Sequence, residues 1–218
     1  MEDREYYHKR ESKKSFRYRL ERRASEVYNC IVRHRGRKSL RVLDLGTADG
    51  SMIKHLAKEL PDSTFFGIDL SPYLLLRAKE KGFTVVCSDI GRLPFKQGTF
   101  DVVTGAAVIE HLDSIERAME EVVRVLKSSG LCVFTTPNPL HDALISALVP
   151  WYGKGHTQRV SLRRLKQIFL GYNLIPLTAE RFLLLPFKVP GENFIEKLFK
   201  KAGLGVLLFN QVIAGQPR

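Results

Sequence analysis

The stretch that decides the fold runs from Arg41 to Gly50 and reads Arg-Val-Leu-Asp-Leu-Gly-Thr-Ala-Asp-Gly. Its first half is a short apolar run that predicts a buried strand, and a helical pattern begins at Ser51. A glycine-rich turn between a strand and a helix lets a ligand approach the backbone and meet amide groups at the helix N-terminus. The segment therefore predicts a ligand-binding loop at the carboxyl end of a strand.

Strands and helices alternate on both sides of this loop. Strands are predicted over Leu40–Leu45, Thr64–Ile68, Phe83–Cys87, Phe100–Thr104, Leu131–Thr136, Leu174–Leu185 and Val206–Ile213. Helices are predicted over Ser51–Leu60, Ser71–Lys81, Asp113–Lys127, Leu162–Leu170 and Glu192–Ala202. Asp113 begins its helix in a capping-box pattern, and Gly130 follows the same helix as a stop. The pattern predicts an α/β fold, with a doubly wound, mainly parallel seven-stranded sheet and helices on both faces.

Charge divides the chain into three parts. The 218 residues carry a net charge of +12, of which +8 lies in residues 1–41, −3 in 42–140 and +7 in 141–218. An acidic centre suits a cationic ligand and basic ends suit an anionic partner, although a solvated basic surface gives the same counts. We expect residues 1–39 to form a basic N-terminal helical arm and residues 40–218 to form the main domain.

Composition excludes several classes of protein. Hydrophobic residues make up 44% of the chain and the mean hydropathy is −0.13, which is typical of a globular domain. No apolar run is long enough to span a membrane, and the first residues have no apolar core of a signal peptide. Cys30, Cys87 and Cys132 lie far apart, which argues against a disulfide framework or a zinc site and fits a cytoplasmic protein.

The loop itself distinguishes two classes of ligand. A dinucleotide-binding turn has glycines at the first, third and sixth positions, but here these positions hold Gly46, Ala48 and Ser51. Asp44 stands two residues before the first glycine. Its carboxylate would repel a pyrophosphate, and it suits a ligand that carries an ammonium and a sulfonium group.

Two further strands lead to a carboxylate. Asp69 follows the second strand, where it can accept hydrogen bonds from both hydroxyls of a ribose. Asp89 and Ile90 follow the third, where the acid can accept from an adenine amino group and the aliphatic side chain can cover its ring. Each Asp alone is more often a helix cap. Because parallel strands end at one edge of a sheet, the three together predict one crevice.

At these motifs the chain resembles the class I S-adenosylmethionine-dependent methyltransferases, in particular the small-molecule group. The resemblance covers residues 40–138 and is strongest at Val42–Gly46, Gly67–Ser71, Ser88–Phe95, Phe100–Thr104, Val108–Leu112 and Arg124–Gly130. It implies a Rossmann-like methyltransferase fold and S-adenosyl-L-methionine as the cofactor. The cofactor-binding residues that it implies are Asp44, Gly46, Ala48, Gly50, Asp69, Leu70, Asp89, Ile90 and Ala106. Ala48 departs from the family, which usually has glycine there.

The same resemblance suggests groups that face the methyl acceptor. Candidate catalytic residues are Glu110 and His111 after the fourth strand, and His156 before the last helix of the domain; His141 is a weaker candidate. In related quinone-pathway enzymes another Glu completes a metal site with the matching Glu-His pair, but Ala107 stands at that position, so we expect no metal. Residues 139–160 and 186–203 are predicted to be lid segments over the acceptor.

Three functions remain open from the sequence. The first is methyl transfer to an oxygen or nitrogen of a small or lipid- or sugar-linked, anionic acceptor. The second is an RNA or protein methyltransferase that uses the basic ends, although no recognisable RNA-binding module is present. The third is a non-catalytic relative that binds S-adenosylmethionine. It is considered because Ala48 stands where the family usually has glycine. The helix predicted at Glu192–Ala202 either packs its apolar face on the core or meets an anionic membrane surface, which would place the protein at the inner face of the membrane.

Overall fold

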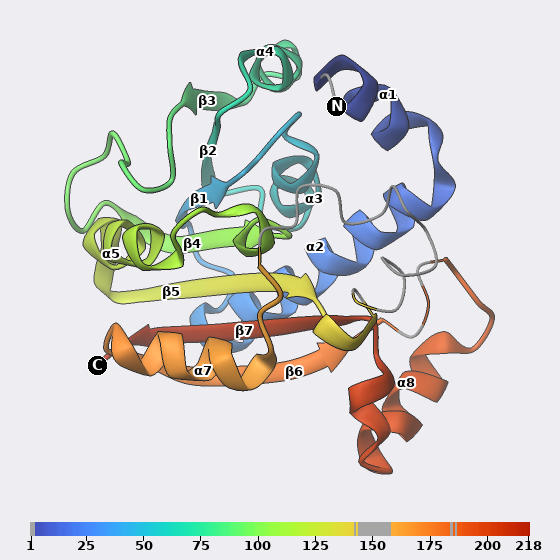
Figure 1. The fold of residues 1–218 in the computed structure, drawn as a ribbon. Helices are drawn as coiled ribbons and strands as arrows, with labels where there is room; N and C mark the ends of the chain where they lie inside the picture. The colour runs from blue at the N-terminus through green and yellow to red at the C-terminus, as the bar shows by residue number, and fades with distance from the viewer. Residues whose placement is uncertain (1–2, 142, 144–157, 184, 186) are drawn as a thin grey trace.

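The computed structural model describes residues 3–141, 143, 158–183, 185 and 187–218. Within these ranges seven strands form one sheet in the order β3-β2-β1-β4-β5-β7-β6 (Figure 1). The strands are β1 (Arg41–Leu45), β2 (Thr64–Asp69), β3 (Thr84–Cys87), β4 (Phe100–Ala106), β5 (Leu126–Pro137), β6 (Leu174–Phe182) and β7 (Asn210–Pro217). The predicted α/β class and seven-stranded sheet are confirmed.

The direction of the strands locates the crevice. Strands β1 to β5 pair in parallel, whereas β7 runs antiparallel to both β5 and β6. In the register, Asp44 of β1 lies between Gly67 of β2 and Thr104 of β4. The chain moves outward from β1 through β2 to β3 and then returns to β4 on the other side of β1. Ligands bind in open α/β sheets at such a switch point, outside the carboxyl ends of the strands.

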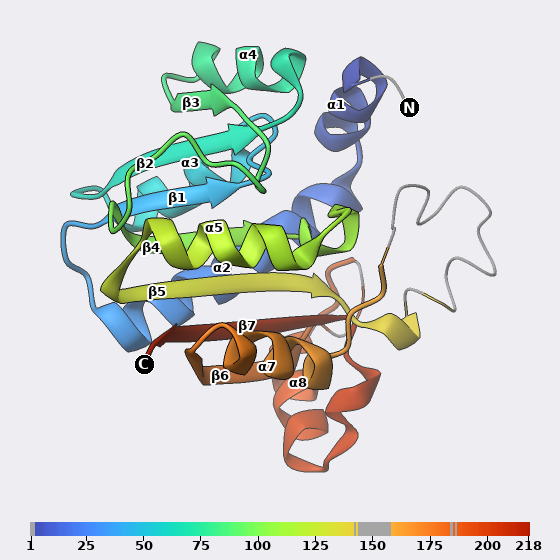
Figure 2. The ribbon, with the colours of Figure 1, turned by 60° about the vertical axis from the view of Figure 1, so that its left-hand side comes forward.

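Helices cover both faces of the sheet (Figure 2). On one face, α2 (Lys14–Arg35) and α3 (Ser51–Glu59) pack on alternate strand residues such as Val42 and Val102. On the other face, α5 (Ile115–Val125) and α7 (Leu162–Gly171) pack on Leu43 and its neighbours. The alternation of Val42 and Leu43 between two cores follows from the two-residue period of a strand. α2, which lies in the predicted arm, thus buries an apolar stripe against the sheet.

Three further helices and two 3-10 turns lie outside these covering layers. α4 (Pro72–Glu80) packs on β3, and α1 (Asp3–Ser12) lies beside α4. η1 (Ile109–His111) follows β4. Both views show α8 (Glu192–Lys201) beyond the β6 edge of the sheet (Figures 1 and 2), and the turn η2 (Leu204–Leu207) contacts it. No helix among the described residues is both long and apolar enough to cross a membrane.

Two predicted boundaries around α5 are wrong. The helix begins at Ile115 because Ser114, not Asp113, caps it; the Ser114 hydroxyl accepts a hydrogen bond from the Arg117 N–H at 3.3 Å. The helix ends at Val125, and β5 begins at Leu126 rather than at Leu131. Gly130 therefore lies inside a strand. A Cβ there would stand 2.6 Å from the Leu126 side chain, so the glycine makes room for that side chain and does not stop the helix.

The α8 helix reverses the packing expected from its sequence. The sequence pattern predicts that Phe194, Ile195, Leu198 and Phe199 share a face that packs on the core. Phe194 is 72% exposed and Leu198 is 53% exposed, whereas Ile195 and Phe199 are half-buried. Glu192 and Glu196 are buried instead. The carboxylates are buried because α2 supplies their hydrogen-bond partners, which lie far away in the sequence. The prediction of core packing is therefore wrong for Phe194 and Leu198.

Glu121 and Arg124 of α5 hold the segment that follows β3. Arg124 donates to the carbonyl oxygens of Leu93 and Phe95 and to the Glu121 carboxylate, which also accepts from the Leu93 N–H at 2.6 Å. The Arg124 guanidinium and this N–H together hold the pKa of Glu121 below its ordinary value of 4.5. A carboxylate of this kind stabilises the fold above pH 4.5, and its contribution is lost as the pH falls through the lower, folded-state pKa.

We expect Glu121→Gln to lower the free energy of unfolding at pH 7 by about 0.5–1 kcal/mol, because the ion pair is partly open to solvent. The difference from the parent protein should shrink as the pH falls below 4.5, the ordinary value. Urea unfolding at pH 7 and at acidic pH measures both quantities. Glu120→Gln, at an exposed neighbouring site, is the control. A penalty that stays constant across the pH range would contradict the assigned ion pair.

Candidate functional site

A cavity of about 500 Å³ lies at the carboxyl ends of the central strands. It is lined by the loop after β1, the ends of β2 and β3, and the segment after β4. The lining residues are Asp3, Gly46, Ala48, Asp69, Leu70, Ser71, Leu74, Ser88, Asp89, Ile90, Ala107, Val108, His111 and Leu112. Six of the nine residues predicted to bind the cofactor are among them, and the exceptions are Asp44, Gly50 and Ala106.

Gly46 allows the loop to turn tightly into this cavity. Its φ is +64°, and a Cβ at this position would stand 2.7 Å from Cγ2 of Val108. Both the backbone conformation and the close contact therefore require glycine. The turn brings the backbone of the loop to the edge of the crevice, as the sequence predicts.

Ala48 adopts a conformation that explains why its family usually has glycine there. Its φ is +50°, in the left-handed region, where a non-glycine residue costs about 1–2 kcal/mol. The Ala48 N–H donates to the Asp69 carboxylate at 2.9 Å. This bond holds the strained residue in place at the wall of the cavity. The methyl group at position 48 is therefore compatible with a formed loop.

Asp69 joins the loop to the second strand. One carboxylate oxygen accepts from the Ala48 N–H and the other from the Ser71 N–H, each at 2.9 Å. A carboxylate offers about four acceptor positions, so two remain for a ligand. Ser71 caps α4 by accepting from the Leu74 N–H. The Asp69 carboxylate thus has a fixed orientation and free acceptor positions at the edge of the cavity.

Asp44 and Gly50 lie outside the lining. Asp44 is buried, and its carboxylate accepts from the Thr104 hydroxyl of β4 at 3.0 Å. Gly50 has a φ of +75° and begins α3, and a Cβ there would stand 2.6 Å from the Phe83 ring. Both residues flank the loop without lining the cavity.

Residues that follow the third strand form part of the cavity wall. Asp89 is exposed, and its carboxylate accepts from the Gly91 N–H at 2.8 Å. Ile90 is buried in the core that also contains Phe100. The acid and the aliphatic side chain thus lie at the wall together, as the sequence predicts for an adenine site.

The segment after β4 differs from prediction by one residue. Ala106 pairs with Thr135 of β5 and packs on the core, whereas Ala107 lines the cavity. Ala107 has a φ of +55°, so the chain turns there and presents the next residue, Val108, to the ligand side. The sequence motif alone does not show where the strand ends, and hence which alanine faces the crevice.

Glu110 and His111 point to different environments. Glu110 is buried and accepts from the Thr136 hydroxyl of β5 at 3.0 Å, while its backbone carbonyl accepts from the Gln158 N–H. It therefore ties η1 to β5 and does not line the crevice. His111 is exposed and lines the crevice. The structure thus separates two residues that the sequence predicts as a catalytic pair.

Of the other two histidine candidates, only His141 is described, and it does not line the crevice. His156 lies outside the described residues. The ring of His141 is hydrogen-bonded to the Leu207 carbonyl at 2.8 Å and stacks on Phe209, so it joins two segments of the tail. In the described part of the chain, no three His, Cys, Asp or Glu side chains gather as they would around a metal ion.

The N-terminal arm contributes to the crevice in a way that the sequence did not reveal. Asp3 of α1 lines the cavity, and its carboxylate accepts from the Ser71 hydroxyl. The Tyr7 and Tyr73 rings meet edge to face at 6.3 Å, which joins α1 to α4. Because these contacts depend on the docking of α1, only the clustering of aromatic residues in a basic arm could have signalled them.

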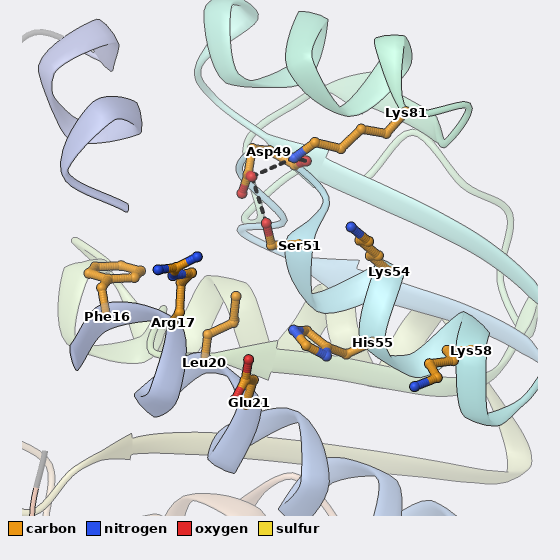
Figure 3. A pocket seen from close by; sticks show the side chains of 10 residues that line it. All are labelled: Phe16, Arg17, Leu20, Glu21, Asp49, Ser51, Lys54, His55, Lys58 and Lys81. Atoms are coloured by element: carbon orange, nitrogen blue, oxygen red, sulfur yellow. Dashed lines mark hydrogen bonds and ion pairs between the residues drawn. The ribbon is translucent and has the colours of Figure 1, made fainter. Parts of the chain in front are cut away.

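A second cavity of about 830 Å³ lies on the other side of the same loop, between α2 and α3 (Figure 3). Arg17, Lys54, His55 and Lys58 give it a basic wall, and Phe16 and Leu20 give it an apolar one. Lys81 pairs with buried Asp49 at 2.7 Å. Because Lys81 and Asp49 neutralise each other, Arg17, Lys54 and Lys58 against Glu21 leave the cavity with a net positive charge, which favours anions.

Residues 43–134 match the family of the methyltransferase domain. The malonyl-[acyl-carrier protein] O-methyltransferase of Herminiimonas arsenicoxydans is 36% identical over 95 residues, covering 44% of this chain and 36% of that protein. The demethylmenaquinone methyltransferase of Chlorobaculum tepidum is 26% identical over 170 residues, covering 77% of this chain and 66% of that protein. The chain thus spans about a third to two thirds of the length of these relatives.

Among solved structures, phosphoethanolamine N-methyltransferase 2 of Haemonchus contortus, in complex with S-adenosyl-L-methionine, has a TM-score of 0.68. At 18% identity, the similarity covers 89% of this chain and 53% of that one, and it shows the shared fold. With the sheet, the matched domain and the curated relatives in agreement, residues 43–134 belong to the methyltransferase-domain family, as the resemblance to the class I S-adenosylmethionine-dependent methyltransferases implies.

Proposed function

We propose that this protein transfers a methyl group from S-adenosylmethionine to an oxygen or nitrogen of a small or lipid- or sugar-linked, anionic acceptor. The observation that carries the proposal is the cavity at the sheet's switch point, where Asp69 and Asp89 stand at successive strand ends. The residues fit this cofactor. Asp69 has acceptor positions left for a ribose, and the turn at Gly46 has no room for a Cβ.

In this proposal the protein acts mainly by positioning. Asp69 binds the ribose hydroxyls, Asp89 and Ile90 bind the adenine, and Ala107 and Val108 line the end nearest the acceptor. The bound cofactor supplies a methyl group on a sulfonium, which is already a good leaving group. The chain therefore needs to align the acceptor with that methyl group and exclude water. A carboxylate acceptor needs no base, whereas a hydroxyl acceptor is best served by a nearby histidine.

Two features support an anionic acceptor that is larger than a free metabolite. The residues 141–218 carry a net charge of +7, and the curated relatives include an enzyme whose name specifies an acyl-carrier-protein-linked substrate. A quinone ring, as in the name of the Chlorobaculum tepidum relative, is a further acceptor to test. A lipid-linked acceptor would also bring the protein to the inner membrane surface as a peripheral protein.

The proposal is tested with S-adenosylmethionine that carries an isotopic label in its methyl group. The protein is incubated with lipid, sugar-linked, carrier-protein, quinone and RNA fractions, and the label is located by mass spectrometry. Label in a lipid-, carrier- or sugar-linked product supports the proposal. Saturable binding of the cofactor without label in any fraction would instead favour a non-catalytic relative.

We expect His156→Ala to slow turnover at least tenfold while cofactor affinity stays near normal, since a base would act on the acceptor alone. Single-turnover rates and calorimetric affinity separate the two effects. His141→Ala is a matched control, because the His141 ring contacts Leu207 and Phe209 of the tail. If neither rate nor affinity changes in the His156 variant, this histidine has no part in the reaction.

The basic cavity between α2 and α3 favours one second candidate, methylation of RNA. Arg17, Lys54 and Lys58 line it, and a polyanion would lie along such a surface. Binding that depends on phosphate contacts weakens steeply with salt. Label recovered in the RNA fraction, together with a steep loss of RNA binding between low and physiological salt, would favour this candidate over a lipid-linked acceptor.

A further inference from the structure

Helix α8 turns two glutamates inward and two of its large apolar side chains outward. Glu192 and Glu196 are buried, whereas Phe194 and Leu198 are 72% and 53% exposed. Large apolar side chains on a monomer surface are unremarkable when scattered, but a contiguous group marks an interaction site. The exposed apolar side chains of α8 are therefore candidates for an interaction site.

Specific contacts hold α8 in this orientation. The Glu192 carboxylate accepts from the Tyr18 hydroxyl, and the Glu196 carboxylate accepts from Arg22 of α2 at 2.7 Å. Glu196 also accepts from the Leu183 N–H at 3.1 Å. Burial and the hydrogen bond to Glu192 raise the pKa of Tyr18 well above its usual range, as expected for a phenol that donates to a buried carboxylate. Turning α8 over would leave the Tyr18 hydroxyl, Arg22 and the Leu183 N–H without these acceptors.

The apolar surface extends beyond the helix. The turn η2 packs against α8, and three of its side chains, Leu204, Val206 and Leu207, are each more than 40% exposed. We name the five exposed side chains Phe194, Leu198, Leu204, Val206 and Leu207 the α8 face. Figures 1 and 2 both show α8 outside the layers of the sheet and its covering helices, so the α8 face is borne on a projecting part of the fold.

Lysines flank the α8 face. Lys197 and Lys201 of α8 are exposed, and so is Lys188 just before the helix. Lys200 instead pairs with Glu180 and Glu196, so it belongs to the inner side. A helix with Phe and Leu on one side and lysines beside them is the pattern of a segment that lies in the interface of an anionic bilayer. Each such lysine adds about 1 kcal/mol of attraction near an anionic surface.

We propose that the α8 face docks this protein on the surface of an anionic lipid bilayer. The projecting shape lets the apolar side chains reach the acyl boundary, while the lysines remain level with the headgroups. Contact of this kind is peripheral, since no helix among the described residues can cross a bilayer. The α8 face lies apart from the cavity proposed to bind the cofactor, so membrane docking is a function separate from methyl transfer.

The test is cosedimentation of the full chain with two kinds of vesicle, phosphatidylcholine alone and phosphatidylcholine with 30% phosphatidylglycerol, a composition chosen to present about the charge of an anionic leaflet. We expect binding to the anionic vesicles and little to the neutral ones. Phe194→Glu with Leu198→Glu should reduce the partition coefficient at least tenfold. The matched control is Leu76→Glu with Leu170→Glu, which makes the same charge change at exposed leucines of α4 and α7 and should leave binding unchanged.

Calorimetric affinity for S-adenosylmethionine, measured on every variant, shows that the fold and the cofactor site survive the changes. This readout also separates the two proposals, because membrane docking can fail while cofactor binding and methyl transfer remain. Equal loss of vesicle binding in the control pair would overturn the assignment of the α8 face. A second result would also overturn it: the parent protein binds no vesicles and forms a dimer in sedimentation equilibrium, and Phe194→Glu with Leu198→Glu dissociates that dimer. The α8 face would then join two copies of this chain.

Discussion

Asp69→Ala is expected to weaken S-adenosylmethionine binding by about 3–5 kcal/mol, which is roughly a hundredfold or more in the dissociation constant. The carboxylate would accept two hydroxyl hydrogen bonds from the ribose, and hydrogen bonds to a charged group are the stronger kind. It also accepts from the Ala48 N–H, so its removal frees a loop residue held at a φ of +50°. Isothermal titration calorimetry with the cofactor measures the loss.

Two further variants separate the ribose contact from support of the loop. Asp69→Asn keeps one acceptor oxygen and should lose less affinity than the alanine variant. Asp62→Ala removes an exposed carboxylate elsewhere on the sheet's periphery and should bind normally. If Asp69→Ala binds the cofactor as tightly as the parent protein does, the cofactor lies somewhere other than the crevice described above.

Glu196→Ala is expected to lower the free energy of unfolding by about 3–5 kcal/mol, as is typical when one partner of a buried ion pair is removed. The Glu196 carboxylate accepts from Arg22 at 2.7 Å and from the Leu183 N–H at 3.1 Å, and its side chain is only 8% exposed. The alanine variant leaves a guanidinium and a backbone N–H without this acceptor. Urea unfolding monitored by circular dichroism measures the change in stability.

The neighbouring positions provide the controls for Glu196. Glu196→Gln keeps an acceptor for the Leu183 N–H and should cost less than the alanine variant. Lys197→Ala changes an exposed residue of the same helix and should stay within about 0.5 kcal/mol of the parent protein. A cost for Glu196→Ala as small as that for Lys197→Ala would mean that α8 does not rest on α2 through this carboxylate.

The main sheet and the cofactor loop follow from local patterns. Alternating apolar runs and helical periods predict the strands, and the glycine-rich turn after β1 predicts the loop, because both depend on residues that are neighbours in the chain. Asp69 and Asp89 come together because parallel strands end at one edge. Their convergence therefore follows from topology that the sequence pattern already implies.

Two predicted site residues, Glu110 and Ala106, lie outside the cavity lining. Glu110 and His111 are adjacent in the sequence. Glu110 is buried and accepts a hydrogen bond from the Thr136 hydroxyl, whereas His111 lines the crevice. Similarly, Ala106 and Ala107 are chemically alike. Only the position where β4 ends decides which of them lines the cavity.

By itself the sequence determined the fold class, the loop at Gly46 and the acidic strand ends, because each depends on spacing along the chain. The tertiary structure alone decided the roles of α1 and α8. In α8, Glu192 and Glu196 repeat with the same spacing as Phe194 and Leu198, so the helical period does not show which stripe faces inward. The carboxylates face inward because Tyr18 and Arg22 donate hydrogen bonds to them, and each donor is 174 residues away from its glutamate in the sequence. A buried charge is tolerated only where hydrogen-bond donors are present.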